Sequence, residues 1–158
     1  MNMNTKRRTF LKGAGAAGTV AVAVAAGLLK PTEVLAAEWN KAAFDAKGMP
    51  DALKVLDATG SAVSKDITIK APDIAENGAV VPVEVTSKIA GTSSIVLMVE
   101  KNANPLTANF DLANGAEGYV STRIKMGQTS NVRVVVKAGG KSYTAVKEVK
   151  VTIGGCGG

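Results

Sequence analysis

Between residues 67 and 153, apolar and polar residues alternate with a period of two over short segments. A period of two indicates half-buried β-strands, because successive side chains of a strand point to opposite faces of the sheet. The run Ala138-Gly139-Gly140-Lys141 predicts a hairpin turn. About seven short strands separated by turn residues are typical of an all-β, immunoglobulin-like antiparallel sandwich, which is the fold that the sequence predicts. The expected strands span residues 67–71, 80–88, 94–100, 106–112, 119–126, 132–136 and 142–153.

Three of these segments carry more specific information. Pro82 has no backbone N–H for a sheet, so its strand is expected at an edge or to contain a bulge. The uninterrupted apolar run Ile95–Val99 predicts a central strand. In the last segment Tyr143 and Val149 are expected on the inward face, and a regular strand would place the charged Lys147 on that face as well. This predicts a bulge near Lys147. The side chains expected to share the inward faces are Val81, Val83, Val85, Leu106, Ala108, Phe110, Leu112, Val120, Thr122, Ile124, Met126, Val132, Val134, Val136, Val149, Val151 and Ile153.

The segment before the strands has the spacing of helices. Apolar residues recur at three- and four-residue intervals within 38–47, and Gly48 is expected to end this helix. Pro50 suits the first turn of a second short helix over 51–58. Together they form a helical lead-in over 38–58, which Trp39 is expected to fasten to the sheet. The apolar residues of the two helices are Trp39, Ala42, Ala43, Ala46, Leu53, Val55 and Leu56.

The first residues have the features of an export signal. The twin arginines Arg7 and Arg8 precede an uncharged run of roughly 17 residues, at the lower limit of a membrane-spanning length. Small residues then surround Ala36, as a signal peptidase requires. We therefore expect a Tat signal peptide over 1–36, cleavage after Ala36 and a periplasmic protein exported in its folded state. The alternative is an uncleaved N-terminal anchor; the mature form is expected to have no membrane segment.

Charge gives little guidance to function once this leader is set apart. The whole chain has a net charge of +6, and the expected leader, with five basic residues and one acidic residue, carries +4 of it. The remaining residues are therefore near +2. This balance gives no reason to expect a nucleic-acid partner. Residues 37–153 have the length of one domain.

The residue inventory excludes several kinds of site. The sequence contains no histidine and a single cysteine, so it cannot supply a Ser-His-Asp triad, a Cys-His pair or a typical zinc site. Its acidic residues are scattered and are expected on the solvated surface. We therefore expect no catalytic residues, no metal and no cofactor. The acidic residues concerned are Asp66, Asp73, Glu76, Glu84, Glu100, Asp111 and Glu117.

The candidate for chemistry is the single cysteine, Cys156. It lies between two pairs of glycines, Gly154-Gly155 and Gly157-Gly158. Glycine lacks a Cβ and adopts many backbone conformations, so residues 154–158 are expected to form a slim, flexible arm. No local group would activate the thiol, which favours a carrier over an enzyme. Alternatives are a structural interchain disulfide through Cys156 and a handle for thiol coupling; a thiol–disulfide oxidoreductase is disfavoured because no second cysteine exists.

The ending Val149-Lys150-Val151-Thr152-Ile153-Gly154-Gly155-Cys156-Gly157-Gly158, together with the Tat leader and the Val-rich strands, resembles the SoxY family. These proteins are the sulfur-carrier subunits of the bacterial sulfur-oxidising (Sox) system. The resemblance covers the layout of the whole chain, and its specificity rests on the glycine-flanked cysteine that follows a strand.

The resemblance implies that Cys156 holds sulfur intermediates derived from thiosulfate. It also implies a heterodimer with a SoxZ-like subunit. Transient partners would be a c-type cytochrome enzyme that couples thiosulfate to Cys156, a hydrolase that releases sulfate, and a sulfane dehydrogenase. The chain itself would catalyse nothing. The alternative function is a structural periplasmic sandwich cross-linked through Cys156 as a dimer.

Overall fold

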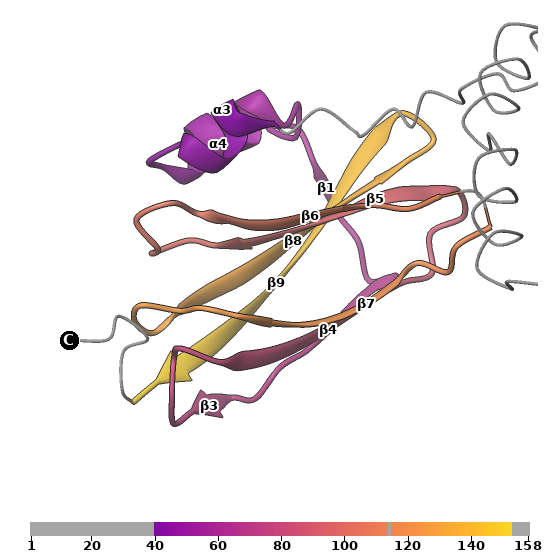
Figure 1. The fold of residues 1–158 in the computed structure, drawn as a ribbon. Coiled ribbons are helices and arrows are strands. Elements are labelled where there is room, and N and C mark those ends of the chain that lie inside the picture. The colour runs from indigo at the N-terminus through magenta and orange to yellow at the C-terminus, as the bar shows by residue number, and fades with distance from the viewer. Residues whose placement is uncertain (1–39, 114, 153–158) are drawn as a thin grey trace, which may run out of the picture. The chain divides into compact units, whose positions relative to one another are not determined.

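The computed structural model describes residues 40–113 and 115–152 and shows an all-β sandwich with two short helices (Figure 1). Seven of its strands match the predicted ones, and two further strands, β1 and β3, have two residues each. The elements are α3 (Lys41–Asp45), α4 (Met49–Val55), β1 (Ala62–Val63), β2 (Ile67–Lys70), β3 (Ile74–Ala75), β4 (Val81–Ser87), β5 (Thr92–Val99), β6 (Leu106–Asp111), β7 (Tyr119–Ile124), β8 (Ser130–Ala138) and β9 (Lys141–Val151).

The strands form two layers. One sheet has the order β1-β9-β8-β5-β6, with β3 also paired to β9, and the other has the order β2-β4-β7. The long strands pair antiparallel, as predicted, but β1 and β3 run parallel to β9. The central position of β5, between β8 and β6, confirms the prediction from its continuous apolar run. The helices lie on the outer side of the larger sheet, and the three-stranded sheet is the lower layer in Figure 1.

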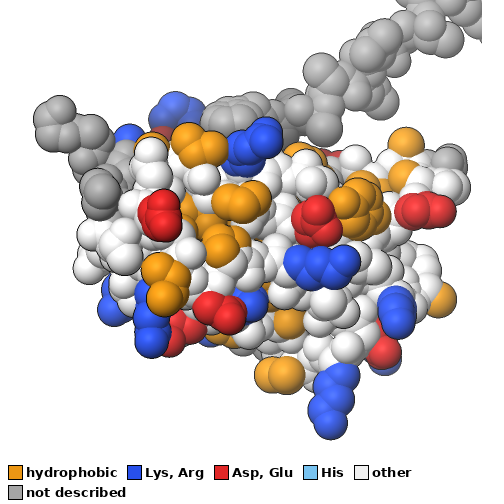
Figure 2. Space-filling model, turned by 90° about the horizontal axis from the view of Figure 1, so that it is seen from below, with side chains coloured by type: hydrophobic (Ala, Val, Ile, Leu, Met, Phe, Trp, Pro, Cys, Tyr) orange, Lys and Arg blue, Asp and Glu red, His pale blue; other side chains and the backbone are white. Residues whose placement is uncertain are grey.

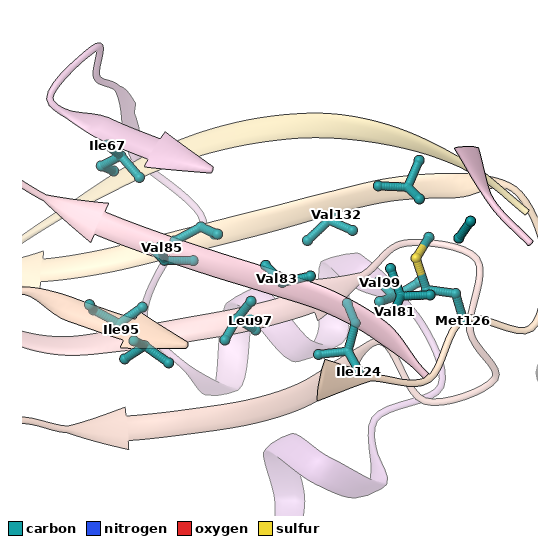
Figure 3. Packing of buried hydrophobic residues seen from close by; sticks show 14 of the residues in the cluster. Ile67, Val81, Val83, Val85, Ile95, Leu97, Val99, Ile124, Met126 and Val132 are labelled. Atoms are coloured by element: carbon teal, nitrogen blue, oxygen red, sulfur yellow. The ribbon is translucent and has the colours of Figure 1, made fainter. Parts of the chain in front are cut away.

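The main hydrophobic core lies between the two sheets (Figure 3). Alternate residues of β4, β5 and β8 point into it, because a strand with one face on a core must place every second side chain there. The predicted inward valines of β4 and β8 are all buried. Val120 and Ile124 of β7 are buried too, as is Met126, which follows β7. The buried members of this core are Ile67, Ala75, Val81, Val83, Val85, Ile95, Leu97, Val99, Val120, Ile124, Met126, Val132, Val134, Val136 and Val149.

A second, smaller core attaches the helices to the larger sheet. Pro50 lies in the first turn of α4, as predicted, and Gly48 caps the start of that helix. Ala43 is buried, but Ala42 and Val55 are exposed, so the predicted stripe was wrong at these two positions. The helices are shorter than expected, and Ala52 takes an inward place. Trp39 lies outside the described residues. The buried members of this core are Ala43, Ala52, Leu56, Ala58, Val96, Met98, Leu106 and Val135.

The predicted bulge near Lys147 was wrong. The register between β8 and β9 is continuous from Ser130–Val149 to Ala138–Lys141. Lys147 lies on the same face of β9 as Tyr143 and Val149, and its Nζ is 2.9 Å from Asp73 Oδ1. A lysine can occupy such a position because its aliphatic stem covers apolar surface while its ammonium group reaches solvent or a partner.

The strand containing Pro82 was predicted to lie at an edge or to contain a bulge, and both alternatives were wrong: β4 lies between β2 and β7, and its register with each is continuous. Proline is tolerated there because β2 pairs only with residues 84–87 of β4. Successive residues of a strand direct their backbone groups to opposite neighbouring strands. Ser87 N donates to Gly118 O, beside β7, so the odd-numbered residues of β4 face β7 and even-numbered ones such as Pro82 face away from it. Pro82 therefore removes no hydrogen bond from the β4–β7 ladder.

Leu106 was predicted to face the same core as Ala108 and Phe110, and this was wrong. The register of β5 with β6 shifts so that Leu97 pairs with Ala108 while Met98 pairs with Leu106. The extra residue places Leu106 on the opposite face, against the helices.

The outer face of the three-stranded sheet is open to solvent. Alternate residues of β4, such as Glu84, point to this face, where Lys70 Nζ lies 3.9 Å from Glu84 Oε2. Seen from below, basic, acidic and hydrophobic side chains are interspersed on this side of the molecule (Figure 2). The arrangement matches the inward-apolar, outward-polar alternation of the sequence.

Gly118→Ala will lower the free energy of unfolding by about 1–3 kcal/mol. A Cβ at Gly118 would lie 2.6 Å from Ser87 O, in the contact where Ser87 N donates to Gly118 O, so the backbone must shift. Urea denaturation measures the change. Gly60→Ala is the control, because a Cβ there meets no atom within 4 Å. Equal stability of the two variants would contradict this account of the β4–β7 junction.

Candidate functional site at the end of the last strand

The predicted site residues lie outside the described residues. They are Cys156, its neighbours Gly154, Gly155, Gly157 and Gly158, and the export residues Arg7 and Arg8. The structure does describe the base from which the cysteine segment departs, because Thr152 is the last described residue and precedes Cys156 by four positions.

The end of β9 is held on both of its edges. On one edge Lys150 N donates to Asp73 O at 3.0 Å, and Thr152 N donates to Ala75 O at 3.1 Å. On the other edge Val151 N donates to Thr129 Oγ1 at 2.9 Å. Strand β1 pairs only with Tyr143 and Thr144 of β9, and β3 pairs with Lys150 and Val151 near the end of the strand. Hydrogen bonds therefore hold the strand as far as Thr152, the last described residue.

Further contacts reinforce this base. Thr152 Oγ1 donates to Glu76 O at 3.1 Å, and the ion pair of Lys147 with Asp73 ties β9 to the start of β3. The hydrogen bond from Lys147 lowers the pKa of Asp73. Because Asp73 is largely exposed, this ion pair contributes little to the free energy of unfolding, and its main effect is to orient the start of β3 against β9.

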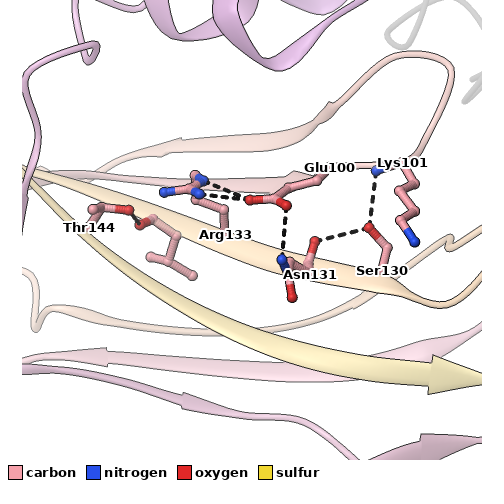
Figure 4. A network of polar contacts seen from close by, with 7 residues as sticks. Glu100, Lys101, Ser130, Asn131, Arg133 and Thr144 are labelled. Atoms are coloured by element: carbon pink, nitrogen blue, oxygen red, sulfur yellow. Dashed lines mark hydrogen bonds and ion pairs between the residues drawn. The ribbon is translucent and has the colours of Figure 1, made fainter.

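A polar network lies on the outer face of the larger sheet, at the same end as the start of β8 (Figure 4). Glu100 Oε1 accepts hydrogen bonds from Arg133 Nη2 at 2.7 Å and Nε at 3.1 Å. Its Oε2 accepts from Asn131 Nδ2 at 2.9 Å. Ser130 Oγ accepts from Lys101 N at 3.0 Å, which joins the end of β5 to the start of β8. The network ties the end of β5 to the start of β8, and β8 in turn pairs with β9.

Glu100 will contribute stability that is lost in acid. Partial burial raises the pKa of Glu100, but the hydrogen bonds from Asn131 and Arg133 outweigh it, and its pKa lies below the ordinary 4.5. The unfolded chain therefore binds the proton first, so the stabilisation is present above pH 4.5 and disappears as pH falls through the lower folded pKa. The thermal stabilities of wild type and Glu100→Gln should differ at pH 7, and the difference should shrink as the pH falls from 4.5 through the lower folded pKa. Glu117→Gln, at an exposed position, is the control; a constant difference between wild type and Glu100→Gln at every pH would contradict the assignment.

Neither a metal centre nor a membrane-spanning helix is present in the described part of the chain. No three acidic side chains of the described residues come together as metal ligands, and these residues include no histidine or cysteine. Within the same ranges, no helix is long and apolar enough to cross a bilayer.

Sequence reasoning missed the residues that secure the end of β9. Thr129, Ala75 and Asp73 come from other segments, and their proximity to β9 depends on pairings that the strand pattern does not contain. One signal was visible: Lys147 occupies an inward position, which indicates a partner for its charge.

These features define the class of protein: an all-β sandwich that fixes its last strand up to four residues before its only cysteine. The family model described as "Sulfur oxidation protein SoxY" matches residues 54–156, and the match ends at Cys156. The chain belongs to the SoxY family, and its role is that of a carrier in sulfur oxidation.

A solved structure supports this placement. The chain is similar to the sulfur carrier protein SoxY from Chlorobium limicola f thiosulfatophilum, with 46% sequence identity and a TM-score of 0.59. The similarity covers 66% of this chain and 96% of that chain. No curated protein matched the chain. Membership of the family implies a partner from the Sox system.

Proposed function

We propose that this protein holds thiosulfate-derived sulfur covalently on Cys156 and presents it to periplasmic enzymes. The observation that carries the proposal is that the SoxY family match extends through Cys156, the only cysteine of the chain. The base of that segment supports it, because β9 is held on both edges and supplies a firm anchor for a short tether.

The chemistry proceeds in three steps on the cysteine sulfur. A c-type cytochrome enzyme joins the Cys156 thiol to the outer sulfur of thiosulfate; an S–S bond forms, a proton is released, and two electrons pass singly to the oxidised haems of that enzyme and its electron acceptors. A hydrolase then adds water to the terminal sulfone, which leaves as sulfate, and a persulfide remains on Cys156. A sulfane dehydrogenase consumes that persulfide sulfur. In every step the protein supplies the thiol and the tether, and the partner supplies the catalytic groups.

The setting follows from the same proposal. Arg7 and Arg8 direct folded export through the Tat pathway to the periplasm, and residues 1–36 are removed. A SoxZ-like subunit accompanies the chain as a heterodimer. The competing function is a structural role, in which Cys156 forms one permanent disulfide between two copies.

Intact-mass measurement of the native protein tests the proposal. The protein is taken without reductant from cells grown on a reduced sulfur compound, and its C-terminal peptide is mapped. We expect thiosulfonate, persulfide or longer sulfane adducts on Cys156 that a thiol reductant removes. A homogeneous Cys156–Cys156 dimer that is independent of the sulfur source, in a preparation without a SoxZ-like subunit, would establish the structural role instead.

A further inference from the structure

A cleft of about 500 Å³ opens between the β5–β6 and β7–β8 loops. The first loop contributes Lys101, Asn102 and Asn104, and the second contributes Lys125, Gly127 and Gln128. A second cleft, of about 420 Å³ beside Ile89 and Leu112, has no charged residue among the described residues that line it. The two clefts differ in charge, and only the first carries exposed ammonium groups.

The loops around the lysine cleft are fastened to each other. Asn102 Nδ2 donates to Lys125 O at 2.8 Å, and Asn102 Oδ1 accepts from Gly127 N at 3.0 Å. Gln128 Nε2 donates to Lys101 O at 3.4 Å. These amide groups are engaged in holding the walls, so the groups left for a ligand are the ammonium groups of Lys101 and Lys125. The side chains that line the cleft include no carboxylate in the part of the chain that the structure describes.

A third lysine extends the positive charge to the rim. Lys47 Nζ donates to Asn104 Oδ1 at 3.2 Å, while Asn104 Nδ2 donates to Phe44 O at 2.8 Å. Asn104 thereby joins the β5–β6 loop to the segment after α3. The cleft is suited to a small anion with oxygen acceptors, because such groups accept hydrogen bonds from ammonium donors.

The cleft lies beside the end of β9. Gln128, on its wall, is followed by Thr129, whose Oγ1 accepts a hydrogen bond from Val151 N. Lys101 N donates to Ser130 Oγ, and Ser130 pairs with Val149 of β9. The β5–β6 loop, the β7–β8 loop and the end of β9 accordingly lie at one end of the sandwich (Figure 1).

The tether is long enough to reach the cleft. Cys156 follows Thr152 by four residues, and four extended residues span at most about 14 Å. The wall of the cleft begins one residue away from Thr129, which contacts Val151 directly. The sulfur adduct adds further reach beyond the Cys156 side chain.

We propose that the Lys101–Lys125 cleft binds the sulfonate end of the thiosulfonate carried on Cys156, so that the loaded arm docks on its own sandwich. The inference rests on the proposed function. The free thiol has no sulfonate for the lysines, and the persulfide left after sulfate release has lost it. Docking therefore depends on the adduct, and two exposed ion pairs hold the arm weakly enough for transfer to an enzyme.

Loading and amide NMR test the docking. The intact protein, with any subunit that copurifies, is labelled with ¹⁵N and treated with tetrathionate; the Cys156 thiolate takes the S–SO₃⁻ group, thiosulfate leaves, and intact mass verifies the adduct. We expect the Gly127 backbone amide and the Asn102 side-chain amide to shift on loading. The double variant Lys101→Gln/Lys125→Gln should show smaller shifts, because the ratio of docked to free arm should fall roughly two- to thirtyfold.

The control is Lys88→Gln/Lys141→Gln, which changes the charge equally at exposed positions outside the cleft and should keep the shifts. Spectra of the unloaded variants report their folding. An adduct that forms without moving these amides, or that moves them equally in Lys101→Gln/Lys125→Gln, overturns the docking and leaves the carrier function intact. Failure of Cys156 to accept the adduct overturns both.

Free thiosulfate added to Cys156→Ser separates the tethered group from an anion in solution. The tether gives an effective concentration of about a millimolar or more, so free thiosulfate should move the same amides only in that range. Saturation at micromolar thiosulfate would show that the cleft serves a free anion, and it would overturn the assignment to the arm.

Discussion

Cys156→Ser will abolish thiosulfate oxidation that depends on this protein. Serine keeps the size of the side chain, but its hydroxyl cannot form the sulfur–sulfur bond that the carrier role requires. Serine differs from cysteine by one atom, and the hydrogen bonds that hold the end of β9 are made by residues up to Thr152, so the unfolding transition of the sandwich should stay unchanged. The measurement is thiosulfate-dependent reduction of cytochrome c in a reconstituted mixture of Sox proteins, where the signal should fall to the level without this protein.

A relocated thiol provides the matched control. Ser121 is exposed on the outer face of β7, and Ser121→Cys in the Cys156→Ser background keeps one accessible cysteine. This thiol should accept sulfur from tetrathionate but should not restore thiosulfate oxidation, because it lacks a tether that enters an enzyme. Restored activity with the cysteine at position 121 would show that the position of the thiol is unimportant, against the proposed function.

Leu97→Ala will lower the free energy of unfolding by about 2–5 kcal/mol. Leu97 is fully buried in β5, where it pairs with Val134 of β8 and Ala108 of β6. The substitution removes apolar contacts and leaves a cavity between strands that cannot easily close, because β5 is held on both edges. Since whole domains are stable by about 5–15 kcal/mol, this is a large fraction of the total. The expected fall in Tm is on the order of 10 °C.

Val146→Ala is the control for that measurement. Val146 belongs to the same sheet, but its side chain is 44% exposed. Its truncation should change stability by less than about 1 kcal/mol. Chemical denaturation of both variants gives the comparison, and a loss for Leu97→Ala no larger than that for Val146→Ala would contradict the central position of Leu97 in the core.

The sequence by itself determined the strands and the chemical inventory. Alternation of valines with polar residues marks β4 and β8, because only a period of two places them on one face of a sheet. Gly139 and Gly140, both with positive φ, mark the hairpin between β8 and β9. The absence of histidine and the presence of one cysteine reduced the candidates for chemistry to Cys156, and the family match includes that residue.

Only the tertiary structure decided how the strands are ordered and what surrounds the end of β9. Local periodicity predicts a bulge at Lys147 because it cannot show Asp73, which the segment before β3 brings within 2.9 Å. Pro82 predicts an edge or a bulge, because the sequence does not show that β2 stops before reaching it. The cleft of Lys101 and Lys125 was invisible for the same reason: the two lysines come from different loops, and hydrogen bonds between distant segments place them together at the end from which the Cys156 segment departs.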